Sequence, residues 1–300
     1  MPDVEIRPFS DEHLEAAAAL LADRHERHLA AEPLLARDVD YRAQLAAIDG
    51  DGLVALRGGE LRAYLFGETT GEDAFVPFAG CAAVEPELLR DLYAVLAPTW
   101  ERNRQRVHVP ATDTVLIDVW FRLAFGVQLV FGVRETAGDA RAPTDVTVRL
   151  GRDDDLDDAA RLSNMLWEHQ HSSPSFSGRT LYSFESMREH WRGTWNDPAY
   201  VHFVAERDGK AVGQLLLFRR PQDDLRIPSG NIDLSHASVA PEARGAGVGV
   251  ALTECALAWA RGEGFRSMTV DWREVNLLAS RFWPRRGFRP TFYRLYRHVP

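Results

Sequence analysis

The chain has 300 residues, about twice the usual size of a domain, which predicts two domains. A hydrophobic fraction of 45%, a charged fraction of 26%, and 22 glycines with 16 prolines are typical of a globular protein and argue against a disordered or fibrous chain. The net charge of −9 divides into −11 for residues 1–145 (14 arginines, 25 acidic residues) and +2 for residues 146–300 (21 basic, 19 acidic). Neither half is basic enough for general nucleic-acid binding.

Composition also bears on the compartment. No apolar run reaches the roughly 18 residues that a membrane-spanning helix needs. The first residues, MPDVEIRPFSDEHLE, are acidic where a secretory signal is basic and then apolar. Cys81 and Cys255 make no disulfide framework. We therefore expect a cytoplasmic protein that does not associate with membranes, and its oligomeric state stays open.

An internal repeat links the two halves. A shift of 142 residues lays Val4–Arg7 on Val146–Arg149, and six further identities follow: Asp11, Leu14, Ala17, Ala18, Leu20 and Glu26 fall on Asp153, Leu156, Ala159, Ala160, Leu162 and Glu168. Each copy begins with a short strand and an acidic helix start, followed by apolar residues at helical spacing. The small, polar segment Ala137–Pro143 suits a linker. The chain is predicted to be a duplicated unit with domains at 1–142 and 143–300.

The second copy shows its element order more clearly than the first. Its patterns predict strands over Val146–Leu150, Val201–Arg207, Ala211–Phe218, Ile232–Val239, Ser267–Trp272 and Phe292–Arg297, and helices over Asp153–Trp167, Leu181–Trp195, Gly247–Glu263 and Leu277–Arg286. Asp208-Gly209 is a strong hairpin signal between two of the strands. The order predicts an α/β fold, a mixed sheet with helices on its faces. Each copy has room for only one strand after its last helix, so we expect the domains to complete one another's sheet edges.

The most informative motif lies between the strand that ends at Val239 and the next helix. It reads Arg244, Gly245, Ala246, Gly247, Val248, Gly249. Glycines let the backbone approach a ligand, and the first amides of a helix have no internal partners and lie at its positive end. The segment therefore predicts a pyrophosphate site, although it is neither a Walker loop nor a Gly-x-Gly-x-x-Gly fingerprint.

With this motif, the second half resembles the GCN5-related N-acetyltransferases (GNAT), whose motif is Gln/Arg-x-x-Gly-x-Gly/Ala. Arg244, Gly247 and Gly249 match that motif, and two further family segments appear as Asn276–Ala279 with Gly287-Phe288 and as Val146–Asp155. The resemblance covers residues 146–300. It implies a tandem member of the family whose C-terminal domain transfers acetyl from acetyl-CoA to an amine.

The same resemblance assigns a cofactor site. It implies that amides from Arg244 to Gly249 hold the pyrophosphate, and that backbone near Ser238 and Val239 pairs with the pantetheine arm. Asn276 would bond the pantetheine or orient the following helix, and a helix N-cap is the alternative role for an asparagine there.

The general acid of the family is not matched. Many members place a tyrosine on the last helix to protonate the departing thiolate, and Trp283 stands there instead. Indole donates a hydrogen bond but does not ionise usefully, so Trp283 cannot be that acid. Pro284, which follows it, disfavours a regular helix at this point.

The base has two candidates. The positions where relatives carry a base are Asp233 and Ser235, which share a face by the period of two in a strand. His236 has the better intrinsic pKa but faces the other way unless the strand carries a bulge. We predict Asp233 or His236 as the base, and transfer by alignment alone is the alternative. His169 and His171, two residues apart, do not face one way on a helix, so no metal site is expected.

The first copy is predicted to be a degenerate GNAT-like domain. Val84–Tyr93 stands where Val239–Val248 stands, and its glycines are gone. The predicted function is acetyl transfer from acetyl-CoA to a primary amine of a small molecule. The tandem layout is similar to that of mycothiol synthases, and aminoglycosides, polyamines and amino acids are equally open as acceptors. A non-catalytic acyl-CoA-binding or partner-binding module is the alternative, and a nucleotide-binding protein a distant third.

Overall fold

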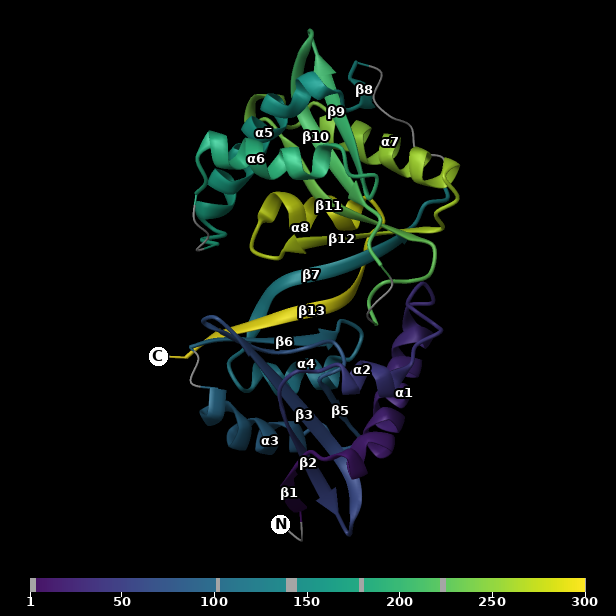
Figure 1. The fold of residues 1–300 in the computed structure, drawn as a ribbon, viewed down its shortest axis with the longest axis vertical. Coiled ribbons are helices and arrows are strands. Elements are labelled where there is room, and N and C mark those ends of the chain that lie inside the picture. The colour runs from purple at the N-terminus through teal and green to yellow at the C-terminus, as the bar shows by residue number, and fades with distance from the viewer. Residues whose placement is uncertain (1–3, 101–102, 139–144, 178–180, 222–224, 300) are drawn as a thin grey trace. The chain divides into compact units, whose positions relative to one another are not determined.

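The computed structural model describes residues 4–100, 103–138, 145–177, 181–221 and 225–299. The chain divides into two compact units (Figure 1). The first comprises Met1–Phe131, Gln222–Ser229 and Pro290–Pro300, and the second comprises Gly132–Pro221 and Gly230–Arg289. The predicted linker lies mostly outside the described residues, and the domain boundary at 142 stays a prediction.

The first unit holds one sheet and its helices. Its strands are β1 (Val4–Pro8), β2 (Asp51–Arg57), β3 (Glu60–Thr70), β4 (Asp73–Val76), β5 (Cys81–Ala83), β6 (Arg104–Pro110), the first part of β7 (Gly126–Glu135) and all but the first residue of β13 (Arg289–His298). Its helices are α1 (Leu14–Ala31), α2 (Tyr41–Ala46), α3 (Leu88–Leu96) and α4 (Thr114–Phe121). The strand order is β1-β2-β3-β4-β6-β13, and β5 pairs with β3.

The C-terminal strand is therefore a member of the first unit. β13 runs antiparallel to β6, with Phe292 opposite Pro110 and His298 opposite Arg104. Phe292 is fully buried in a core cluster that α1 also lines with Ala17 and Leu21. The last strand of the second copy thus completes the sheet of the first unit, as the shortage of strands in each copy predicts.

The second unit follows the predicted element order. Its elements are β8 (Thr147–Leu150), α5 (Leu156–His171), α6 (Phe184–Trp195), β9 (Tyr200–Arg207), β10 (Lys210–Phe218), β11 (Asn231–Val239), α7 (Val248–Gly262), β12 (Ser267–Arg273) and α8 (Leu277–Arg285). The strand order is β12-β11-β10-β9-β8, antiparallel except for the parallel pair β11 and β12. The predicted hairpin turn has both Asp208 and Gly209 at positive φ (51° and 72°), as a type I′ turn requires.

Two irregularities of β11 shape this sheet. Its register with β12 runs only from Asn231 to Leu234, although both strands continue further. Its register with β10 shifts between Leu216 and Leu217, which pair with His236 and Leu234, so Ser235 is an extra residue in a bulge. The strands β11 and β12 therefore leave each other at the bulge, and polar backbone of β11 beyond it is free of a β12 partner.

Candidate functional site: a cavity at the end of β11

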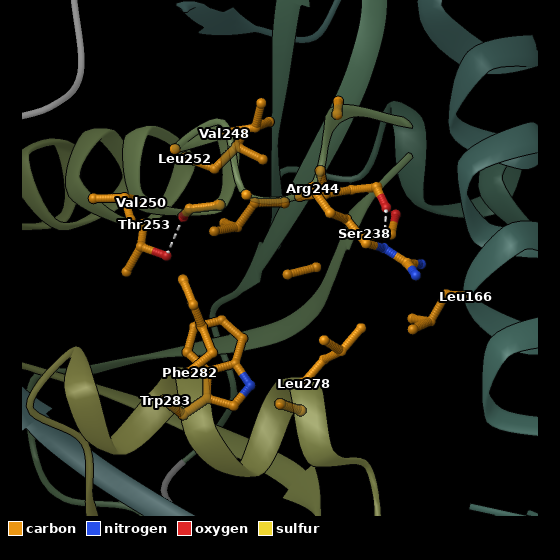
Figure 2. Close-up of a pocket in the computed structure, with 18 of the residues that line it drawn as sticks. Leu166, Ser238, Arg244, Val248, Val250, Leu252, Thr253, Leu278, Phe282 and Trp283 are labelled. Atoms are coloured by element: carbon orange, nitrogen blue, oxygen red, sulfur yellow. Dashed lines mark hydrogen bonds between the residues drawn. The ribbon is translucent and has the colours of Figure 1, made fainter. Parts of the chain in front are cut away.

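A cavity of about 420 Å³ opens in the second unit where the end of β11, the start of α7, α8 and the C-terminal half of α5 converge (Figure 2). Its lining includes all the predicted cofactor-binding residues except Ala246: Ser238, Val239, Arg244, Gly245, Gly247, Val248, Gly249 and Asn276. The rest of the lining is mainly apolar and includes Leu166, Leu278, Phe282 and Trp283, whose side chains face the space from three sides in Figure 2.

The glycine-rich turn forms one wall. Gly245 and Gly247 have φ of 79° and 81°, a left-handed conformation that other residues adopt only with strain, and Gly247 is the N-cap of α7. A Cβ atom on Gly249 would lie 3.3 Å from the Phe282 ring, so this glycine allows α7 and α8 to approach. Arg244 keeps the turn closed with a hydrogen bond of 3.3 Å from Nε to the carbonyl oxygen of Val239. The start of α7, from Gly247 to Val250, consequently lines the cavity.

The end of β11 forms a second wall. Ser238 is 7% exposed and lines the cavity, and its Oγ atom has no hydrogen-bond partner among the described residues. A buried hydroxyl without a partner costs free energy, which a ligand group with a matching polar atom recovers. Sequence reasoning pointed to the backbone here and missed this side chain.

Asn276 organises the third wall. Its Oδ1 atom accepts hydrogen bonds from the amides of Leu278 (3.2 Å) and Ala279 (3.4 Å), so it is the N-cap of α8. The same atom lies 3.2 Å from Nε2 of His169, which comes from α5 and also lines the cavity. Asn276 therefore ties α8 to α5, and His169 lines the same cavity. Among the described residues no group of three or more metal-ligating side chains exists.

Trp283 lies against the same cavity. It is 7% exposed and makes edge contacts with Phe282 (4.9 Å between ring centroids) and Phe288 (5.5 Å). Helix α8 continues through Pro284 and ends one residue later, because a proline so close to the end costs only one backbone hydrogen bond. Trp283 thus supplies a rigid apolar surface rather than an ionisable group.

Asp233 is held away from this cavity by an ion pair. Its Oδ2 atom accepts hydrogen bonds from Nε and Nη2 of Arg220 (3.0 and 2.7 Å), and its Oδ1 atom accepts one from Oγ1 of Thr269 (2.7 Å). The residue is 3% exposed and does not line the cavity. A catalytic role for Asp233 stays a prediction, and these contacts describe a carboxylate whose two oxygens are already occupied.

His236 faces the helices α5 and α6. The bulge at Ser235 brings it to the face of the sheet that carries Asp233, which is the condition set by the sequence pattern. Its Nε2 atom lies 3.3 Å from both Oγ of Ser163 and Nε2 of Gln214, and its ring meets that of Trp191 edge-on at 5.1 Å.

Burial, with the neighbouring His190 and His202, lowers the pKa of His236 to about 4, so its imidazole is neutral at physiological pH. His236 belongs to a polar cluster with Ser163 and Gln214, whose amide nitrogen also donates to Oγ of Ser163 at 3.0 Å. Its role as a base also stays a prediction.

A sequence model described as the acetyltransferase (GNAT) family matches residues 163–288. The matched segment covers less than half of the chain, and this part of the chain is similar to the GNAT family. A mycothiol acetyltransferase from Cellulomonas flavigena is 27% identical over 192 residues, which are 62% of this chain and 51% of that protein. The human N-acetyltransferase 8B is 33% identical over 89 residues, which are 30% of this chain and 38% of that protein. The chain therefore spans about half or less of the length of each of these two relatives.

Solved structures extend the likeness over the whole fold. A GCN5-related N-acetyltransferase from Sphaerobacter thermophilus has a TM-score of 0.62 at 16% identity, covering 99% of this chain and 96% of that one. A tandem GNAT protein from the clavulanic acid biosynthesis pathway has a TM-score of 0.53 at 17% identity, covering 98% and 97%. The predicted fold, a mixed α/β sheet with two GNAT-like domains in tandem, is confirmed. No helix in the described parts of the chain is long and apolar enough to span a membrane.

Proposed function

We propose that the second unit binds acetyl-CoA as a co-substrate and transfers its acetyl group to a primary amine of a small molecule. The observation that carries this proposal is the cavity at the end of β11, which combines a glycine-lined helix start with an apolar channel. The helix start suits pyrophosphate, and the unpartnered Ser238 hydroxyl, next to backbone that β12 does not pair, suits the amides of a pantetheine arm.

In the proposed reaction the neutral amine nitrogen attacks the carbonyl carbon of the acetyl thioester. A carbon–nitrogen bond forms, the carbon–sulfur bond breaks, and CoA leaves as its thiolate. The amine nitrogen gives up one proton and the thiolate gains one, so the products are the amide and CoA with a free thiol. Holding the two reactants in contact in a dry, apolar channel supplies much of the rate.

His236 is the proposed contact for the acceptor, on the α5 and α6 side of the sheet. With a pKa of about 4, its imidazole is a weak base but a permanent hydrogen-bond acceptor near neutral pH. The acceptor amine gives its ammonium proton to water, and its neutral nitrogen then attacks the thioester. We expect kcat/KM to rise with pH as the acceptor amine deprotonates, without an inflection from His236 between about pH 5 and 8. An inflection in that range that disappears in His236→Gln would instead make His236 the base.

Two glycines offer a matched test of the cofactor site. Gly245 (φ 79°) lines the cavity, whereas Gly264 (φ 85°) lies beyond α7 outside it, and an added Cβ meets no atom within 4 Å at either position. Gly245→Ala and Gly264→Ala therefore introduce similar backbone strain, of roughly 1–2 kcal/mol. In calorimetric titration with acetyl-CoA, Gly264→Ala should bind one equivalent like the wild type, and Gly245→Ala should bind at least about tenfold more weakly.

Turnover is tested by CoA release with a panel of amines that includes aminoglycosides, polyamines and amino acids. Release with any amine, reduced in Gly245→Ala, supports acetyl transfer. Binding without release across the panel would favour the non-catalytic acyl-CoA-binding module. Equal binding by both alanine variants, or none by the folded wild type, would overturn the assignment of the cavity.

A further inference from the structure

The first unit has a cavity of its own, of about 370 Å³. It is lined by α1, the end of β5 and the start of α4, through Leu20, Asp23, Arg24, Arg27, Ala83, Val84, Pro86, Asp113, Val115 and Leu116. The internal repeat places it at the same point of the fold as the cavity in the second unit. The shift of 142 lays Arg24 on Leu166 and Arg27 on His169, and Asp113 caps α4 as Asn276 caps α8.

The chemistry of this cavity differs from that of its counterpart. The helix after β5, α3, has no glycine at its start and carries Asp91 in its first turn, so its N-terminus repels a pyrophosphate. The positions of Leu166, His169 and Asn276 in the second unit are taken in the first unit by three charged residues, Arg24, Arg27 and Asp113. The lining contains two arginines, two aspartates and a patch of small apolar residues, so it is balanced in charge.

Arg24 is the unusual member of this lining. It is only 3% exposed, and its Nη1 and Nη2 atoms donate to the carbonyl oxygens of Cys81 and Phe78. Its Nε atom has no hydrogen-bond partner, and the guanidinium forms no ion pair with a carboxylate of the described residues. A buried cation in this state is costly, because burial removes water and no counter-charge replaces it.

Arg27 adds a second cation one turn further along α1. Its side chain is exposed, lines the cavity, and has no ion-pair or hydrogen-bond partner in the described structure. Two guanidinium groups at positions i and i+3 of a helix lie on one side of it, where they can bind one carboxylate together. The carboxylate of the ligand would thus supply the missing counter-charge of Arg24.

The two aspartates of the lining indicate which second charged group the ligand carries. Asp113 uses Oδ1 to accept from the amide of Leu116 (2.9 Å), and Asp23 is exposed on α1. A simple anion would be repelled by both carboxylates, whereas an ammonium group would be attracted by them. We propose that the first unit binds a small zwitterion of the amino-acid class, with its carboxylate at Arg24 and Arg27 and its ammonium at Asp113 and Asp23.

The test is titration of the full-length protein with each of the 20 L-amino acids up to about 10 mM, by calorimetry and by thermal shift. We expect one amino acid or a small related group to bind with one site per chain. The matching carboxylic acid without the ammonium group, and the matching amine without the carboxylate, should each bind at least about tenfold more weakly.

Three variants locate the site. Arg27→Gln removes an exposed charge and should weaken binding of the amino acid at least about tenfold. Asp113→Asn retains an N-cap residue and should weaken the amino acid but not the matching carboxylic acid. Arg37→Gln, which removes an exposed arginine of the same unit outside the cavity, should have no effect.

Several outcomes would overturn the proposal. No binding of any amino acid by the folded protein would do so, as would binding that Arg27→Gln and Asp113→Asn leave unchanged. Equal binding of the carboxylic acid would refute the zwitterion. A second equivalent of acetyl-CoA that Arg27→Gln abolishes would make the cavity a CoA site instead. Because Gly245→Ala should leave amino-acid binding intact, failure here is distinct from failure of the acetyl-CoA proposal.

Discussion

Acid should destabilise the first unit through His28. This residue of α1 is 2% exposed and packs edge-on against Phe292, with 4.8 Å between ring centroids. Burial, with Arg24 and His25 nearby, lowers the pKa of His28 to about 3. In the unfolded chain the pKa of a histidine is about 6.5.

The direction in which stability changes with pH follows from which state, folded or unfolded, binds the proton more readily. In the unfolded chain His28 binds a proton below about pH 6.5, whereas in the folded protein it binds one only below about pH 3. The contribution of neutral His28 to stability is therefore present above about pH 6.5 and is lost as the pH falls. Each pKa unit corresponds to about 1.4 kcal/mol, so about 2 kcal/mol is lost between pH 7.5 and 5.0. The full difference, reached below pH 3, is about 5 kcal/mol.

His28→Leu removes this titration while filling a similar volume. Hydrogen exchange of α1 amides, corrected for the intrinsic exchange rate at each pH, reports the opening free energy of this unit. Between pH 7.5 and 5.0 the wild type should lose about 2 kcal/mol more than His28→Leu, while the other histidines occur in both proteins and largely cancel. His298→Leu, at an exposed position of β13, is the control for loss of a histidine. Equal losses in wild type and His28→Leu would refute the reasoning.

Three further predictions concern the second unit. Ser238→Ala should leave the free protein as stable or more stable in urea denaturation, since an unpartnered buried hydroxyl is lost, and should weaken acetyl-CoA binding by about 1 kcal/mol, roughly fivefold, in calorimetry. Asp233→Asn should lower the free energy of unfolding by roughly 1–3 kcal/mol, because the charge-assisted hydrogen bonds from Arg220 are weakened, and a loss of kcat without a loss of stability would instead mark a base. Asn276→Ala should cost about 1 kcal/mol of stability as the α8 cap is lost and should raise KM for acetyl-CoA, whereas Asn276→Asp should retain the cap.

The cavity at the end of β11 was predictable because its determinants are local in sequence. The left-handed backbone at Gly245 and Gly247 and the helix start at Val248 are properties of one short segment, and glycine is the residue that such backbone favours. The cap at Asn276 follows from the same kind of local rule. The repeat of 142 residues was also enough to predict two units of one fold, which the structural likenesses confirm.

The surroundings of the two candidate bases were not predictable, because they depend on pairing between strands. The bulge at Ser235 resets the alternation of side chains, and only the register of β10 against β11 reveals it. That register also brings Phe218 opposite Asp233, so that Arg220, 13 residues earlier in the chain, can pair with it. A period-two pattern predicts the face of the sheet on which each side chain lies, but it does not predict which side chain forms a hydrogen bond or ion pair with it.

The two cavities show how duplication separates a scaffold from its chemistry. The position of the cavity is set by the end of a strand, a following helix and a capped helix start, and both copies retain these elements. The ligand is set by a few side chains on the wall, and Arg24 in place of Leu166 changes that wall from apolar to cationic. A buried arginine without a counter-ion is hard to reconcile with a domain that serves only as support, because an apolar residue there would avoid the cost of burying a charge. If the first unit binds the proposed zwitterion, the absence of the glycines in the first copy reflects a change of ligand and not a loss of binding.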